Sequence, residues 1–144
     1  MLQPKGLVSV EALSKELIDI IATDHAPHLI DEKNTLQYFN CPSGIPSIEF
    51  FMPLIFKMAQ LSNTNALNLL KLSNINPSKR FNFKNIGKIA PNYKANFVWI
   101  KLSKPSQIQI LSKCQWSPYT QIDLPVFVKA CWHNGIRRYY NEYE

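Results

Sequence analysis

Residues 19–28 read Asp19-Ile20-Ile21-Ala22-Thr23-Asp24-His25-Ala26-Pro27-His28. The apolar, β-branched run over 19–23 follows a helically spaced segment, 8–17, and this order predicts a helix that leads into a buried strand. Pro27 stops regular strand pairing, so polar side chains gather at the carboxyl end of the strand. Chemistry in parallel α/β folds takes place at that end, so the polar side chains here are candidates for a functional site.

The side chains of this stretch suit metal-assisted hydrolysis. Asp24 offers a carboxylate that can bind a metal or carry a proton, and His25 and His28 add imidazoles within four residues. By spacing alone a second interpretation stays open. In it Asp24 caps the following turn, and the two histidines are ordinary polar loop residues.

Downstream, the sequence predicts a long loop followed by helices. The range 29–46 is polar and turn-forming, so we expect a loop there. Ser47 is expected to cap a largely buried helix over 48–60, which Pro53 kinks or shortens at its start. Another helix is expected over 65–72, and a capped, proline-initiated helical turn over 76–81.

The sequence of the last third of the chain predicts β-structure. A turn-bearing segment at 87–92 precedes four short β-prone runs, and Asn134-Gly135 is a pair favoured in two-residue hairpin turns. The expected strands cover 97–100, 106–111, 126–132 and 136–140.

Composition narrows the class of protein. A chain of 144 residues with 46% apolar residues can bury a core of its own. The formal charge of +6 comes from scattered lysines, so we expect no nucleic-acid partner. Three widely spaced cysteines argue against a disulfide framework, no secretory signal is visible, and the apolar run 50–59 is too short to span a membrane. We therefore expect a soluble, cytoplasmic protein.

The stretch 20–28, followed by Asp31-Glu32-Lys33, resembles the signature that closes the last barrel strand of dihydroorotases, which are enzymes of the amidohydrolase superfamily. The run 42–49 is similar to their substrate loop and the helix after it, and 76–81 to the segment that leaves the barrel. Residues 87–98 look like the return into a small β-sandwich, and 113–119 extend the likeness.

The resemblance covers nearly the whole chain and implies an α/β fold. The chain would be the C-terminal fragment of a metal-dependent (β/α)8 barrel plus part of the small β-sandwich subdomain. Residues 1–84 would form the last strand and closing helices of the barrel, and residues 85–144 the C-terminal part of the sandwich.

The resemblance also implies roles for individual residues. Asp24 would ligate a catalytic zinc ion and shuttle a proton between the hydrolytic water and the scissile amide nitrogen. His28 and the backbone around Ser43 and Gly44 would bind the carboxylate of a small anionic substrate, either carbamoyl-aspartate or dihydroorotate. His25 receives no chemical role. Allantoinases and hydantoinases carry a similar aspartate, and the Ala-Pro-His that follows it favours dihydroorotase.

The chain also departs from the family pattern. The family binds its metals with a His-x-His pair, a carboxylated lysine or acidic bridge, and further histidines, whereas the only histidines here are His25, His28 and His133. One carboxylate cannot complete a zinc site. We therefore expect an incomplete C-terminal part that is inactive by itself. The rest of the barrel is either supplied by another polypeptide, such as an upstream-encoded barrel fragment, or is missing from this sequence. The alternative is a non-catalytic remnant or structural partner.

Smaller departures concern turn residues. Asn92 and Asn96 stand where the family has Gly and Asp, and Gln121 stands where Gly is expected. These substitutions put the geometry of the turns in question.

Overall fold

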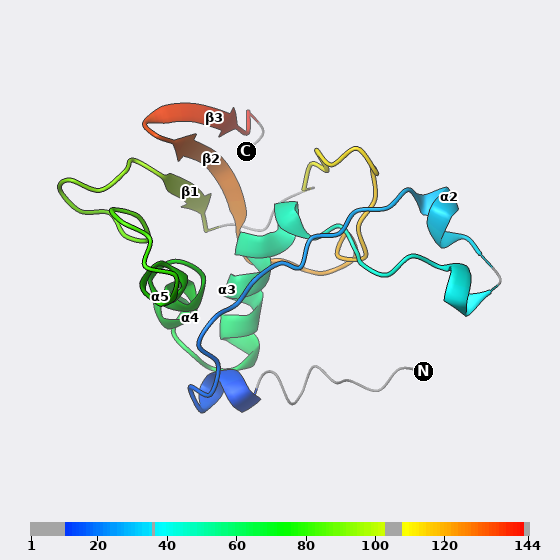
Figure 1. The fold of residues 1–144 in the computed structure, drawn as a ribbon, viewed down its shortest axis with the longest axis horizontal. Coiled ribbons are helices and arrows are strands. Elements are labelled where there is room, and N and C mark those ends of the chain that lie inside the picture. Colours follow the sequence, from blue (N-terminus) through cyan, green and yellow to red (C-terminus); the bar gives the residue numbers. More distant parts are fainter. Residues whose placement is uncertain (1–10, 36, 103–107, 143–144) are drawn as a thin grey trace.

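The structure is a computed structural model that describes residues 11–35, 37–102 and 108–142. A group of helices and a small antiparallel sheet form the body of the molecule, and the loop that carries α2 and η1 extends to one side of it (Figure 1). The described elements are, in order, α2 (Ile30–Lys33), η1 (Tyr38–Asn40), η2 (Ile48–Phe50), α3 (Phe51–Leu61), α4 (Ala66–Ser73), α5 (Ile75–Arg80), β1 (Phe97–Lys101), β2 (Phe127–His133) and β3 (Ile136–Tyr140).

The helix expected over 48–60 is confirmed, with a 3-10 turn, η2, before the α-helix proper. Pro53 is the third residue of α3, a position where a backbone N–H has no acceptor within the helix, so proline is tolerated there. Within the described part of the chain, no helix combines the length and apolar character needed to cross a membrane.

The helix expected over 65–72 is also confirmed, as α4. The side chain of Asn65 accepts a hydrogen bond from the backbone N–H of Leu67 at 2.9 Å, which is an ordinary N-cap. The helical turn expected over 76–81 appears as α5, but no side chain caps it. Asn76 instead donates its Nδ2 to the carbonyl of Asp19 at 2.9 Å, which ties α5 to the segment before Asp24.

The main core lies between the helices. Four buried side chains form it, Leu13, Ile55, Ala59 and Leu69, and half-buried apolar side chains that include Ile18 and Ile21 pack around them. The segment 19–23 therefore has one side against the helices.

The expected strand over 19–23 is not confirmed, because these residues join no β-ladder within the described part of the chain. Their contacts are isolated: Ile21 donates its backbone N–H to the carbonyl of Leu72 at 3.1 Å. A strand exists only through a neighbour, and a parallel neighbour comes from a remote part of a sequence. The helix expected over 8–17 is found at 11–14, and the chain leaves the helical conformation near Glu16, whose φ is 56°. Residues 8–10 lie outside the described part.

Three of the four strands expected in the last third are confirmed. They form one antiparallel sheet in the order β1-β2-β3, and β2 packs against α3. Asn134 and Gly135 have φ values of 51° and 79°, which is the paired positive φ of a two-residue hairpin turn. The strand expected over 106–111 is wrong for 108–111, which are not in a strand, and its residues 106–107 lie outside the described part.

Two of the turn residues that differ from the family pattern, Asn92 and Asn96, fit their positions in the structure. Asn92 adopts the left-handed conformation at φ 65°, which asparagine tolerates better than most residues with a side chain. Asn96 accepts a hydrogen bond from the backbone N–H of Asn134 at 2.7 Å and so ties the entry of β1 to the hairpin turn. The local geometry therefore does not require Gly and Asp at these positions.

Candidate active site

The stretch 20–28, which contains the predicted catalytic Asp24, and the predicted substrate loop within residues 42–49 lie side by side (Figure 1). Ala26 donates its backbone N–H to the carbonyl of Ile45 at 3.1 Å, within an isolated parallel bridge between His25 and Ile45. The hydroxyl of Ser47 donates to the carbonyl of Thr23 at 3.0 Å rather than capping the helix that follows it. The structure thus joins two segments that the sequence presents about twenty residues apart.

Gly44 is the closest point between these two segments. Its φ is 101°, and a Cβ on it would meet the Cβ of Ala26 at 2.4 Å and the carbonyl oxygen of Ala26 at 2.9 Å. Only glycine fits this conformation and this space. Gly44 therefore allows its loop to approach Ala26, within the stretch 20–28, closely.

Lys33 holds the loop from its other side. Its ammonium group donates to the carbonyl oxygens of Pro42 and of Gly44, the latter at 3.0 Å. These bonds fix the backbone on both sides of Ser43, whose side chain is exposed. Lys33 belongs to the motif that resembled the family, but its place in the sequence did not indicate which groups it would bind.

Asp24 lies where the extended segment turns. Its φ is 46°, in the left-handed region, and its side chain is exposed. Aspartate is among the few residues that enter this region at modest cost, and such conformations cluster at functional sites. The carboxylate is thus available to a ligand or to a further part of the fold.

His28 lies at the other end of the stretch. Its Nδ1 lies 3.6 Å from Oε2 of Glu32, and the same carboxylate oxygen accepts the backbone N–H of Leu29 at 2.8 Å. Glu32 therefore caps the short helix α2, and its carboxylate lies beside the imidazole of His28. The ring is only partly buried, so a small ligand can reach it.

His25, to which sequence reasoning assigned no role, holds the two segments together. Its Nδ1 accepts hydrogen bonds from the backbone N–H groups of Ser47 at 3.0 Å and of Ile48 at 3.2 Å. Nδ1 therefore acts as the acceptor for two backbone donors in this arrangement. No local pattern could have revealed these bonds, because their partners are 22 and 23 residues away.

A third segment, residues 111–119, contacts both of the others, and we refer to it as the brace. Trp116 donates its indole N–H to the carbonyl of His28 at 2.7 Å, and Ser117 donates its hydroxyl to the carbonyl of Pro46 at 2.8 Å. Sequence reasoning included part of the brace in the resemblance but did not predict that it contacts the site.

Glu49 anchors the start of the brace. Its Oε1 accepts from the backbone N–H groups of Leu111 at 3.1 Å and Ser112 at 2.6 Å, and from the Ser112 hydroxyl. Burial by itself raises the pKa of Glu49, but the hydrogen bonds from Ser112 and Leu111 outweigh it, so the pKa is lowered from the ordinary value of 4.5. The other oxygen, Oε2, is buried without a hydrogen-bond partner among the described residues.

The metal expectation can be tested against the donors present. Among residues 11–35, 37–102 and 108–142, no three His, Cys, Asp or Glu side chains are grouped as a metal site would need. Asp24 supplies one exposed carboxylate, and the Nδ1 of His25 is already engaged by backbone N–H groups. These residues fit at most one ligand position of a zinc site, which takes three or four protein ligands.

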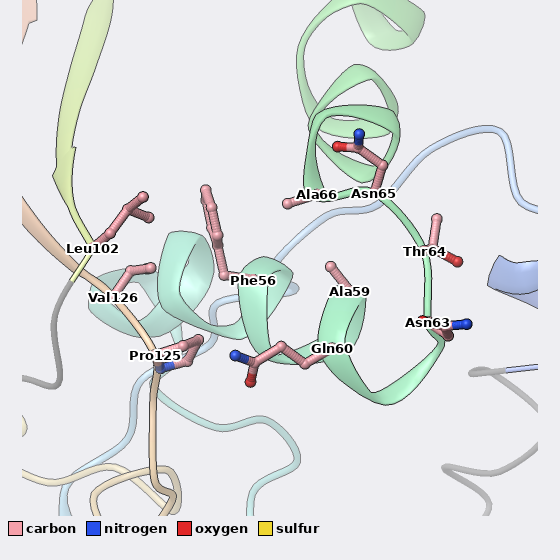
Figure 2. Close-up of a pocket in the computed structure, with 10 residues that line it drawn as sticks. All are labelled: Phe56, Ala59, Gln60, Asn63, Thr64, Asn65, Ala66, Leu102, Pro125 and Val126. Carbon is pink, nitrogen blue, oxygen red and sulfur yellow. The ribbon is translucent and has the colours of Figure 1, made fainter.

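A separate groove of about 560 Å³ opens between α3, the connection to α4 and the start of β2 (Figure 2). Its lining includes Phe56, Asn63, Leu102 and Val126. None of the predicted site residues, Asp24, His28, Ser43 and Gly44, lines it. The groove is therefore distinct from the candidate active site.

Sequence comparisons point to one family. The model of the Amidohydrolase family matches residues 5–130. The chain is 33% identical to a dihydroorotase from Archaeoglobus fulgidus over 105 residues, which is 71% of this chain and 25% of that protein. It is 33% identical to a dihydroorotase from Streptococcus thermophilus over 123 residues, 83% of this chain and 29% of that protein. The chain thus spans between a quarter and a third of the length of these relatives.

Solved structures agree in fold. A dihydropyrimidinase from Brevibacillus agri superposes with a TM-score of 0.81 at 19% identity, covering 94% of this chain and 31% of that one. A D-hydantoinase from Thermus sp. gives a TM-score of 0.77 at 20% identity, covering 91% of this chain and 30% of that one. At such low identity the likeness concerns the fold alone.

Proposed function

The chain belongs to the amidohydrolase family, and from this premise we propose that it carries the closing part of the active site of a cyclic amide hydrolase. Its reaction would be the reversible conversion of dihydroorotate and carbamoyl-aspartate. The supporting observation is that residues 24–28 pack against residues 42–48, with the closest approach between Gly44 and Ala26. In this junction the carboxylate of Asp24 stays exposed. The curated relatives named dihydroorotase support this substrate.

Each residue of the junction has a proposed task. Asp24 takes the proton of the hydrolytic water as the water oxygen attacks the ring carbonyl, and returns it to the amide nitrogen as the C–N bond breaks. His28 donates a hydrogen bond to the substrate carboxylate, and the backbone at Ser43 and Gly44 binds the same anionic end. A zinc ion bound in part by Asp24 would lower the pKa of the attacking water.

The remaining metal ligands must come from outside the described residues. We propose that a further barrel portion supplies them, in the same or another polypeptide. Residues 1–84 would then contribute the last strand and closing helices of the barrel, and residues 85–144 part of the β-sandwich. In that setting the segment 19–23, which has no ladder here, gains a strand neighbour.

A second candidate is hydrolysis of a hydantoin or dihydropyrimidine ring. The solved structures that share this fold are a D-hydantoinase and a dihydropyrimidinase, which favours it. Their identity to this chain, about 20%, is below that of the dihydroorotases, so we rank it second. Comparing turnover of dihydroorotate with that of hydantoin under the same conditions distinguishes the two.

The test of the proposal is substitution of Asp24 in the chain assembled with the missing barrel portion. Asp24→Asn keeps the shape of the side chain but removes the carboxylate that acts as the base. We expect the rate of hydrolysis to fall by roughly a hundredfold or more. Asp31→Asn, a change at an exposed aspartate of α2, is the matched control and should leave turnover unchanged. Equal rates for Asp24→Asn and wild type would refute the assignment.

A companion substitution separates binding from chemistry. His28→Ala should chiefly raise KM, because the imidazole is proposed to contact the substrate and not the reacting atoms. If His28→Ala and Asp24→Asn have equally small effects on both kinetic constants, the roles given to the two residues are wrong.

A further inference from the structure

We propose that Trp116 is a positioning residue of the active site, which holds the backbone at His28 so that the imidazole meets the substrate carboxylate. The inference rests on the proposed function of His28. It adds to that function a residue from the last third of the chain, 88 positions away from His28.

The hydrogen bond from Trp116 to His28 has a defined direction. An indole offers a single N–H donor and no acceptor, so its orientation is set by the acceptor it finds. That acceptor is the main-chain carbonyl of His28, at 2.7 Å. Fixing this carbonyl fixes one of the two peptide planes at His28, and so limits the directions in which its side chain can leave the backbone.

The brace contacts both halves of the site. Ser117, next to Trp116, is buried, and its hydroxyl donates to the carbonyl of Pro46 at 2.8 Å. Pro46 lies two residues after Gly44 in the same loop. Two adjacent residues, Trp116 and Ser117, thus each hold a carbonyl near one of the proposed substrate contacts, and this arrangement limits the distance between those contacts.

The brace is itself anchored at both ends. Glu49 holds its first residues through Ser112, and the ring of Tyr119 lies 5.9 Å from the buried ring of Phe50 at its other end. Both anchors come from η2, directly after the substrate loop. The brace is therefore tied at both ends to the element that follows the site, and Trp116 lies between the two ties.

A purely structural role for Trp116 predicts something different. If the indole only filled space, Trp116→Phe would keep most of the packing and change neither substrate binding nor the local motion of His28. If it positions His28, losing the N–H should raise KM by roughly tenfold with kcat little changed, because an unpaired carbonyl lets the backbone at His28 move.

The experiment compares Trp116→Phe with Trp99→Phe, a change at an exposed tryptophan of β1. Hydrogen exchange of residues 26–30 is measured in the whole 144-residue chain, and KM and kcat for dihydroorotate in the assembled enzyme. We expect faster exchange at 26–30 and a higher KM for Trp116→Phe only. Unchanged exchange and KM, or a parallel loss in both variants, would overturn the inference.

The two readouts separate this inference from the proposed function. If the assembled wild type fails to hydrolyse dihydroorotate, the proposed function is wrong, and the exchange data still report on His28. Equal exchange at 26–30 in Trp116→Phe and wild type would then show that Trp116 does not position His28.

Discussion

The backbone at Gly44 passes so close to Ala26 that the space for a single methyl group decides whether the site can form. A Cβ at Gly44 would lie 2.4 Å from the Cβ of Ala26, whereas a Cβ at Gly135 would find its nearest neighbour, the Cβ of Ala95, at 3.9 Å. Both glycines have positive φ, so both carry the same kind of conformational demand.

This contrast gives a prediction with a built-in control. Gly135→Ala should cost about 1–2 kcal/mol of unfolding free energy, the usual penalty for a side chain in the left-handed region. Gly44→Ala adds a clash with Ala26 and should cost clearly more, or force the loop away from residues 24–28. Urea unfolding of both variants checks this. Equal losses would mean that the Gly44 loop moves without penalty.

At the scale of elements, the start of η2 depends on His25. The Nδ1 of this residue is the acceptor for the backbone N–H groups of Ser47 and Ile48, as a side-chain cap would be. Ser47, which the sequence suggested as the cap, bonds Thr23 instead. His25 thus performs the capping that the sequence assigned to Ser47.

We predict that His25→Ala destabilises the chain by about 1–3 kcal/mol, since it leaves two backbone donors without their acceptor. His25→Asn should recover part of this loss, because the amide oxygen of asparagine can occupy the place of Nδ1. Thermal unfolding of both variants measures the difference. A result in which alanine and asparagine are equally stable would argue against the capping role.

The elements differ in how far the sequence predicted them. Helices α3 and α4 and the hairpin at Asn134-Gly135 were expected, because they depend on periodicity, capping and turn residues within a few positions. The strand over 19–23 was not confirmed, because β-structure requires a partner strand and the described chain brings none beside it. Residues 108–111 form no strand either, and Leu111 donates its backbone N–H to Glu49.

At the scale of the whole molecule, Glu49 joins the helical part to the last third of the chain. Its pKa is lowered from 4.5 in the folded protein, so the unfolded state binds the proton more readily. The stabilisation is therefore fully present above pH 4.5 and is lost as the pH falls through the lowered pKa. The brace, and with it Trp116, should loosen in acid.

We predict that the unfolding free energy of the wild type falls more steeply between about pH 5 and pH 3 than that of Glu49→Gln. The glutamine cannot titrate, so this contribution to the slope disappears. Glu142→Gln, at an exposed carboxylate after β3, should keep the wild-type slope. The measurement is urea unfolding across this pH range, and identical slopes for all three proteins would contradict the role of Glu49.

The sequence by itself determined the family, the helices around the core, the hairpin turn and the stretch that ends in Asp24 and His28, since these follow from residue types and spacing within short segments. Only the tertiary structure decided which hydrogen bonds hold that stretch. Lys33 donates to the loop carbonyls, His25 accepts from the backbone at the start of η2, and Trp116 donates to the carbonyl of His28. The physical reason is that a hydrogen bond between remote segments depends on where the chain returns in space, and leaves no periodicity in the sequence.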